Sequence, residues 1–208
     1  MQKSKVITDG NIKNGIRPNA AEKEFLSLAY NRFYDLYDEI MVDTFWKKDE
    51  WARFFKIKDI FSVYAELLAY EPIKRVVDWM KKGGRPPMEG EIGSDLFKFI
   101  RNVILHFPFF DSWGSVWISK PIINWNKTDQ SIDKFLRTYI KHKEIKYRFW
   151  EGDKKRMTYL SIKFPTYYNE TSKIFLKDIV SEKEGVKFSI ILMKKILDTQ
   201  VEEIGQEK

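Results

Sequence analysis

Three polar side chains that could perform acid–base and phosphate chemistry lie close together in a mostly apolar stretch, residues 94–108. They are Arg101, Asn102 and His106. An imidazole can transfer protons near neutral pH, an amide can orient a substrate group by hydrogen bonding, and a guanidinium can neutralise growing negative charge. A buried polar group without a partner costs about 1–3 kcal/mol. These groups therefore need either core partners or a ligand bound in a cleft.

The stretch that carries them is predicted to be a buried helix, because it is apolar almost all round. Ser94 is a favourable N-cap, and Pro108 should end the helix because the residue before a proline avoids helical geometry. At about 100° per residue, Asn102 and His106 lie about 40° apart on one face, whereas Arg101 and His106 lie about 140° apart. A second copy of the chain could bring its own Arg101 to the site.

The segment Arg101-Asn102-Val-Ile-Leu-His106 resembles the R-x4–6-H motif of HEPN domains, including the polar residue after the arginine. The resemblance implies an antiparallel helical bundle, often dimeric, and in many members a metal-independent ribonuclease of toxin–antitoxin or antiviral defence systems. It places Arg101, Asn102 and His106 at the catalytic positions and implies cleavage that leaves a 2′,3′-cyclic phosphate. In a homodimer the two motif helices would face each other, which would shorten the gap between Arg101 and His106.

Some HEPN toxins extend the motif to R-x4-H-x-Y, and a partner antitoxin adenylylates the tyrosine. The corresponding position here is Pro108. That mode of control is therefore not expected for this chain, and neither is a nucleotidyltransferase partner.

RNA carries its own nucleophile, the 2′-OH beside each phosphodiester, so a nuclease site needs only three kinds of group. We assign proton transfer to His106, orientation of the phosphate to Asn102, and stabilisation of its growing charge to Arg101. This chemistry requires no metal or cofactor, and we predict none. We expect a metal-independent endoribonuclease that works by 2′-OH attack on the adjacent phosphate. The alternative is a catalytically inactive HEPN-like interaction module, a dimeric scaffold whose three polar groups form a satisfied core network.

The composition of the 208-residue chain is that of a folded, basic protein. Hydrophobic residues make up 43% and aromatic residues 16%, and the net charge of +7 permits an RNA partner without requiring one. The absence of cysteine excludes disulfides and thiol nucleophiles and fits a reducing cytoplasm. No apolar run approaches the roughly 20 residues of a membrane span. We expect a cytoplasmic protein that binds RNA, forms a homodimer and has an antitoxin or defence partner, without membrane attachment.

Hydrophobic periodicity predicts an all-α architecture, with a flexible arm over residues 1–18 and a single helical domain over 19–208. The resemblance implies that this domain is HEPN-like. Asn19 and Glu22 form a capping-box pattern for a helix that runs to about Val42. Further helices are expected over residues 57–80, with a break before Pro72, over 131–140 after a cap at Ser131, over 173–180, and after a capping box at Ser181.

One segment changes to a period of two. Apolar residues alternate with polar ones on both sides of Glu151-Gly152-Asp153, which predicts a β-hairpin of about residues 144–163 inserted into the helical domain. From Lys134 to Arg156 there are nine lysines and arginines against three acids. The candidates for holding RNA phosphates near the cleft are Lys146, Arg148, Lys154, Lys155 and Arg156. The alternative is an exposed strand edge that lysines protect against aggregation.

Two other features could be binding sites, one for nucleic-acid bases and one for a metal ion. The aromatic residues of 109–125 could stack on bases, but packing of an irregular connection against the core is the favoured interpretation. The second histidine, His142, stands between two lysines and is expected at a solvated helix end rather than in a metal site.

Overall fold

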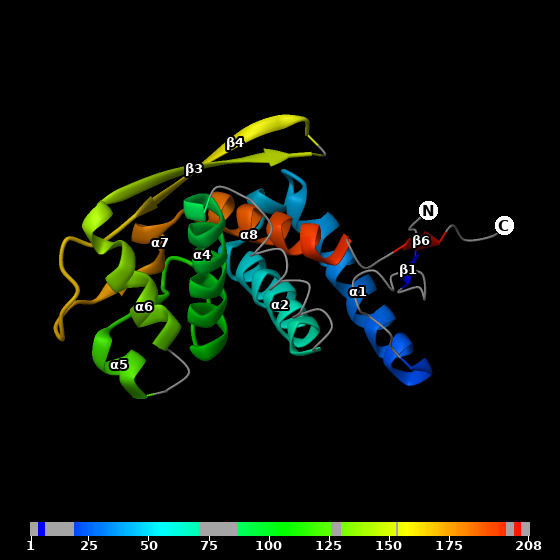
Figure 1. The fold of residues 1–208 in the computed structure, drawn as a ribbon, viewed down its shortest axis with the longest axis horizontal. Helices are drawn as coiled ribbons and strands as arrows, with labels where there is room; N and C mark the ends of the chain where they lie inside the picture. The colour runs from blue at the N-terminus through cyan, green and yellow to red at the C-terminus, as the bar shows by residue number, and fades with distance from the viewer. Residues whose placement is uncertain are drawn as a thin grey trace.

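The computed structural model describes residues 4–6, 19–70, 87–125, 130–152, 154–198 and 202–204. The described chain is mainly helical, with short antiparallel pairs of strands (Figure 1). The helical character expected from periodicity is thus confirmed. None of the described helices is both long enough and apolar enough to span a bilayer.

The helices are α1 (Ala20–Met41), α2 (Glu50–Ala69), α4 (Pro87–His106), α5 (Lys120–Trp125), α6 (Gln130–Tyr139), α7 (Leu176–Ile179) and α8 (Glu182–Leu197), with 3-10 turns at Phe45–Lys47 and Ile140–His142. The strands are β1 (Ser4–Val6), β2 (Trp117–Ile118), β3 (Glu144–Glu151), β4 (Arg156–Lys163), β5 (Ile174–Phe175) and β6 (Glu202–Ile204). They pair as β1–β6, β2–β5 and β3–β4, each antiparallel.

The first two helices begin at side-chain caps. In α1 the predicted capping box forms, because Asn19 Oδ1 accepts from the Glu22 amide at 2.9 Å and Glu22 Oε2 accepts from the Asn19 amide at 2.7 Å. In α2, Asp49 accepts from the amides of Trp51 and Ala52. Helix α2 therefore starts seven residues before the predicted start and ends at Ala69, at the expected break. The remainder of the predicted helix, residues 71–80, lies outside the described residues.

Helix α4 begins at Pro87, so the prediction that Ser94 is its N-cap is wrong. Proline is favoured in the first turn of a helix, where its missing N–H has no intrahelical role. Gly93, which we expected to be in a loop, lies inside the helix against α8: a Cβ there would lie 3.1 Å from Cζ of Phe188. The predicted end of the helix, at His106 before Pro108, is confirmed.

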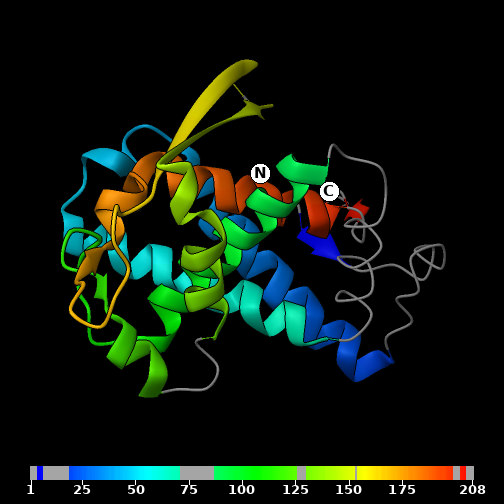
Figure 2. The same ribbon diagram turned by 60° about the vertical axis from the view of Figure 1, so that its left-hand side comes forward.

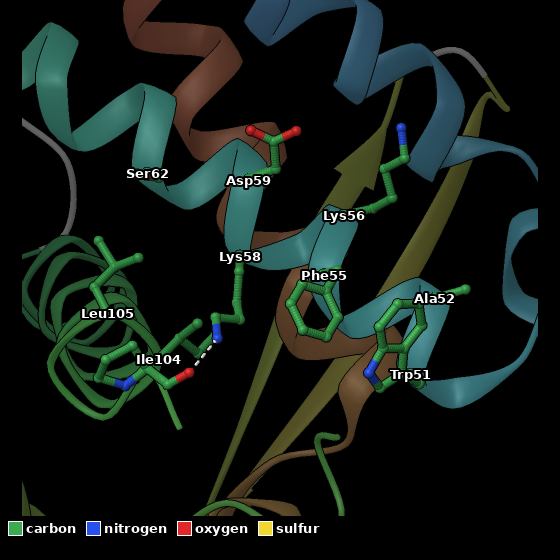
Figure 3. A pocket seen from close by; sticks show the side chains of 10 residues that line it. Trp51, Ala52, Phe55, Lys56, Lys58, Asp59, Ser62, Ile104 and Leu105 are labelled. Carbon is green, nitrogen blue, oxygen red and sulfur yellow. Dashed lines mark hydrogen bonds between the residues drawn. The ribbon is translucent and has the colours of Figure 1, made fainter. Parts of the chain in front are cut away.

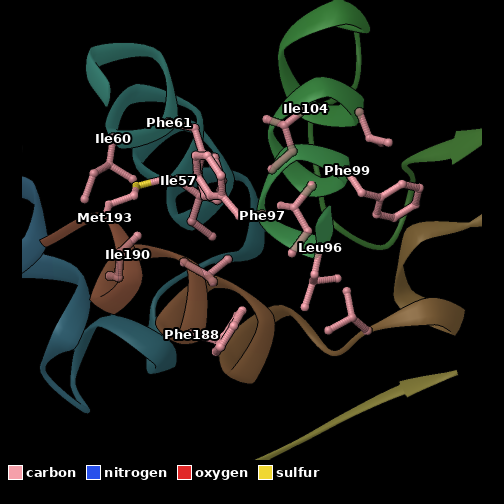
Figure 4. Close-up of a cluster of buried hydrophobic side chains, with 14 of the residues drawn as sticks. Ile57, Ile60, Phe61, Leu96, Phe97, Phe99, Ile104, Phe188, Ile190 and Met193 are labelled. Carbon is pink, nitrogen blue, oxygen red and sulfur yellow. The ribbon is translucent and has the colours of Figure 1, made fainter. Parts of the chain in front are cut away.

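Helix α4 lies between α6 and α2 (Figure 1) and contacts α2, α6 and α8. Figure 4 shows its apolar side chains beside those of α2 and α8. Phe97 stacks on Phe61 of α2 with ring centroids 5.9 Å apart, and Phe99 stacks on Phe135 of α6 at 4.5 Å. Helix α4 thus carries the site candidates in the hydrophobic core.

Two predicted caps are absent farther along the chain. Ser131 lies inside α6, which starts at Gln130, so it caps nothing. Ser181 is the N-cap residue of α8, but its hydroxyl donates to Glu184 instead of accepting a backbone N–H. Residues 173–180, expected to be helical, form the short strand β5 followed by α7.

The hairpin is present as predicted, with β3 and β4 spanning residues 144–163. Its register runs from Glu144 opposite Lys163 to Glu151 opposite Arg156. The strands lie across the helices near α8, and the hairpin stands out from one side of the molecule (Figures 1 and 2). Of the predicted arm, residues 4–6 form β1 and pair with β6, and its other residues lie outside the described residues.

Candidate functional site

Asn102 is a buried link between α4 and α6. Its side chain is 4% exposed, its Nδ2 donates to Ser131 Oγ, and its Oδ1 accepts from Arg101 Nε at 2.9 Å. A side chain enclosed in this way has no free surface for a phosphate. The structure therefore replaces the predicted direct contact with a positioning contact to Arg101.

Arg101 is a half-buried cation without a matching anion. In the part of the chain that the structure describes, no carboxylate lies within ion-pair distance of its guanidinium, which sits 6.0 Å from the ring centroid of Phe97. Burial lowers the pKa of Arg101, and interaction with Tyr64 opposes this shift. Because a desolvated charge without a counter-charge is costly, this guanidinium is a candidate anion-binding group.

His106 is the last residue of α4 and is partly exposed. The side chain of Arg101 points towards Phe97, which lies one turn before it in the helix. His106 lies in the opposite direction, five residues after Arg101 and about 7.5 Å along the helix axis. No hydrogen bond joins Arg101 to His106. One copy of the chain therefore places both groups on one helix without bringing them together.

An open groove of about 700 Å³ lies between α2 and the end of α4 (Figure 3). Its wall includes the exposed rings of Trp51 and Phe55, whose centroids are 4.5 Å apart, and Leu105, which is one turn after Arg101. The Lys58 ammonium reaches the connection that follows α4 and donates to the Pro108 carbonyl at 2.7 Å. The sequence analysis did not single out this groove, although an exposed aromatic pair one helical turn apart is a visible signal.

Two of the five cations proposed to bind RNA form ion pairs with described residues, and three do not. Lys154 Nζ pairs with Asp43 at 2.9 Å, and Arg156 pairs with the buried carboxylate of Glu151 at 3.1 Å. The other three, Lys146, Arg148 and Lys155, are exposed and make no ion pair with any described residue.

Glu151 and Lys187 form a buried pair that the sequence analysis missed. Glu151 Oε2 and Lys187 Nζ lie 3.6 Å apart, and neither atom has a hydrogen-bond partner among the described residues. Burial lowers the pKa of Lys187, and the attraction of Glu151 opposes it. Burial alone would raise the pKa of Glu151, but hydrogen bonds from Thr158 and Arg156 and the charge of Lys187 hold it below 4.5. The available signal was a lysine within the apolar run of α8.

The aromatic connection packs against the core in part: Trp113 is buried and its indole N–H donates to the Val180 carbonyl at 3.1 Å, whereas Phe109 is 72% exposed. His142 is exposed beside Tyr139. Among the described residues no group of three or more His, Asp and Glu side chains is placed to hold a metal ion.

Comparison of the chain with protein-family models, with curated proteins and with solved structures finds no match in any of the three.

Proposed function

We propose that this protein is a metal-independent endoribonuclease of the HEPN type, in a toxin–antitoxin or defence setting, which acts as a homodimer. The observation that carries the proposal is Arg101, a half-buried guanidinium that has no carboxylate partner in the described chain and is held by a buried amide. A planar fork of donors with a permanent charge suits the oxygens of a phosphodiester.

The roles of the three residues follow from their placement. Asn102 fixes the Nε edge of Arg101, so that the outer donors of the guanidinium remain available for phosphate. His106, partly exposed in the last turn of α4, supplies proton transfer. Asn102 is thus a positioning residue, and Arg101 and His106 are the residues that meet the RNA.

The reaction consumes no co-reactant. A base removes the 2′-OH proton, the 2′ oxygen forms a bond to the adjacent phosphorus, and the bond from phosphorus to the 5′ oxygen breaks as that oxygen gains a proton. The products are a 2′,3′-cyclic phosphate and a 5′-hydroxyl end. Arg101 stabilises the charge on the phosphate oxygens as the new bond forms.

A second copy completes this site, because Arg101 and His106 of one chain do not meet. The apolar groove beside α4, with the exposed rings of Trp51 and Phe55, supports a face shared by two copies. Burial of aromatic rings at the centre of an interface is a common source of affinity between subunits.

The test is cleavage of a labelled single-stranded RNA in the presence of EDTA. Wild-type protein should cleave it to cyclic-phosphate ends, and Arg101→Ala and His106→Ala should each lower the rate by at least about a hundredfold. His142→Ala is the matched control, because it removes the only other histidine at an exposed position. Equal rates for His106→Ala and wild type would overturn the proposal.

A second candidate is the non-enzymatic dimeric scaffold, and the bond from Asn102 to Ser131 favours it, because it makes the polar group part of the contact between α4 and α6. In that case the wild-type protein would form a dimer without cleaving RNA. Arg101→Ala would then change stability alone.

A further inference from the structure

The two faces of the hairpin differ in what they contact. Tyr147 and Phe149 of β3 point inwards and place their rings 5.1 and 5.5 Å from the ring of Phe188 on α8. Leu160 and Ile162 of β4 are buried on the same side. Because side chains alternate along a strand, the residues between them face away from the helices.

The outward face carries three large side chains in contact with solvent. Trp150 is 52% exposed, Met157 opposite it is 42% exposed, and Tyr159 is 68% exposed. Large apolar side chains that gather on one outward face mark a contact surface rather than ordinary scatter. An edge protected against aggregation would carry charges without this group of rings.

Cations lie among these side chains. Arg148 is directly opposite Tyr159, and Lys146 is two residues before Arg148 on the same face. Lys163 stands opposite Glu144 at the far end. None of these three cations makes an ion pair with a described residue, in contrast to Lys154 and Arg156 at the tip.

We propose that this outward face of the hairpin binds single-stranded nucleic acid. Its members are Lys146, Arg148, Trp150, Met157, Tyr159 and Lys163. Bases would stack on Trp150 and Tyr159, and Lys146, Arg148 and Lys163 would hold the phosphates between them. Aromatic side chains interleaved with unpaired cations suit a strand whose base faces are open, whereas a duplex hides those faces. That the bound strand is the substrate rests on the proposed function, but binding itself does not.

The test is fluorescence anisotropy with a labelled 12-nucleotide DNA strand. This strand has no 2′-OH, so the proposed reaction cannot cut it, and binding is measured apart from cleavage. Wild-type protein should bind it more tightly than the matching duplex. Trp150→Ala and Tyr159→Ala should each weaken binding about fivefold or more, the range found for loss of one stacked base.

The cations have a separate readout. In Lys146→Ala/Arg148→Ala, the slope of log affinity against log salt should fall by about 1.4, since each phosphate contact on a single strand contributes about 0.7. Tyr167→Ala and Lys134→Ala, at exposed positions off the hairpin, are the matched controls and should bind as wild type does. Unchanged melting temperatures would show that the variants fold.

Three results would overturn the proposal: no binding of the strand by wild type, unchanged affinity in Trp150→Ala/Tyr159→Ala, or equal affinity for strand and duplex. The first would leave the face as a site for a protein partner. The last would indicate attraction by charge alone. Binding that persists in Arg101→Ala while RNA cleavage is absent from wild type would reject the nuclease and keep this surface.

Discussion

Glu151 of the hairpin and Lys187 of α8 face each other across 3.6 Å, with each side chain only 1% exposed. This pair joins the end of β3 to α8, and Glu151 also accepts from Arg156 and Thr158 of β4 within the hairpin. Asp43, in the connection before α2, approaches the same lysine at 4.0 Å. A buried charge is thus held from both the hairpin and the helical body.

Removing one member of this pair should destabilise the protein strongly. Lys187→Met leaves the buried Glu151 carboxylate with Arg156 but without Lys187, and we expect a loss of about 3 kcal/mol in the free energy of unfolding, the lower end of the range for a broken buried pair. The double variant Lys187→Met/Glu151→Gln removes both charges and should recover most of that loss. Urea unfolding measures both, and a double variant no more stable than Lys187→Met would contradict this account.

The same pair predicts how stability depends on pH. The folded-state pKa of Glu151 lies below its ordinary value of 4.5, so the unfolded chain binds more protons, and stability should fall as pH drops below about 4.5. The lowered pKa of Lys187 affects stability at alkaline pH. Between its folded-state pKa and 10.5 the unfolded chain binds more protons, so stability should rise with pH in that range. In Glu151→Gln the free energy of unfolding should fall less steeply at acid pH, which urea unfolding midpoints between pH 3 and 6 would measure.

Asn102 should act on cleavage only through Arg101. Asn102→Ala leaves Ser131 and the Arg101 Nε without their partner and should cost about 1–3 kcal/mol of stability. It should also lower kcat while KM changes little, because the guanidinium loses its orientation. If so, Arg101→Ala/Asn102→Ala cleaves no more slowly than Arg101→Ala. Additive losses in the double variant would show an independent role, and Ser131→Ala should affect stability alone.

Trp113 should matter for stability and not for RNA. Its indole N–H is the donor for the buried Val180 carbonyl, so Trp113→Phe should cost about 1–3 kcal/mol. Affinity for a single strand should stay that of wild type, which thermal melts and anisotropy together would establish. Weaker binding with unchanged stability would instead support base stacking by the aromatic residues of 109–125.

The oligomeric state tests the shared face. Trp51→Glu/Phe55→Glu changes two exposed rings in the groove beside α4, so each chain should fold while the dimer dissociates. Sedimentation velocity should show a monomer, and cleavage should fall with it because the site needs two copies. Lys58 should be left intact, since it ties α2 to the Pro108 carbonyl. A monomeric wild type that still cleaves would remove the dimer from the proposal.

Sequence patterns predicted correctly those elements of the fold that depend on interactions between residues close together in the chain. The capping box at Asn19, the helix end before Pro108 and the hairpin of residues 144–163 all depend on neighbours within a few residues. The start of α4 could not be predicted, because Gly93 is a poor helix former and its close packing against Phe188, 95 positions away in the chain, is not visible in the local pattern. The pairing of β1 with β6 likewise depends on a remote partner.

The site shows the same division. Spacing placed Arg101, Asn102 and His106 on one helix, but it could not reveal that Asn102 faces Ser131 or that no carboxylate of the described residues pairs with Arg101. The cations of the hairpin were visible in the sequence, whereas the pairing of Lys154 with Asp43, 111 positions away, depends on the tertiary fold.

Because side chains alternate along β3 and β4, the sixteen residues of the hairpin strands fall into an inward set that stabilises the fold and an outward set that is free for binding. Substitutions at every second position are constrained by packing against the helices, as for Tyr147 and Phe149 against Phe188, while the intervening positions can change with little effect on folding. Specificity for a new ligand could therefore evolve, or be engineered, on this hairpin without the loss of stability that redesign of a buried cleft usually brings.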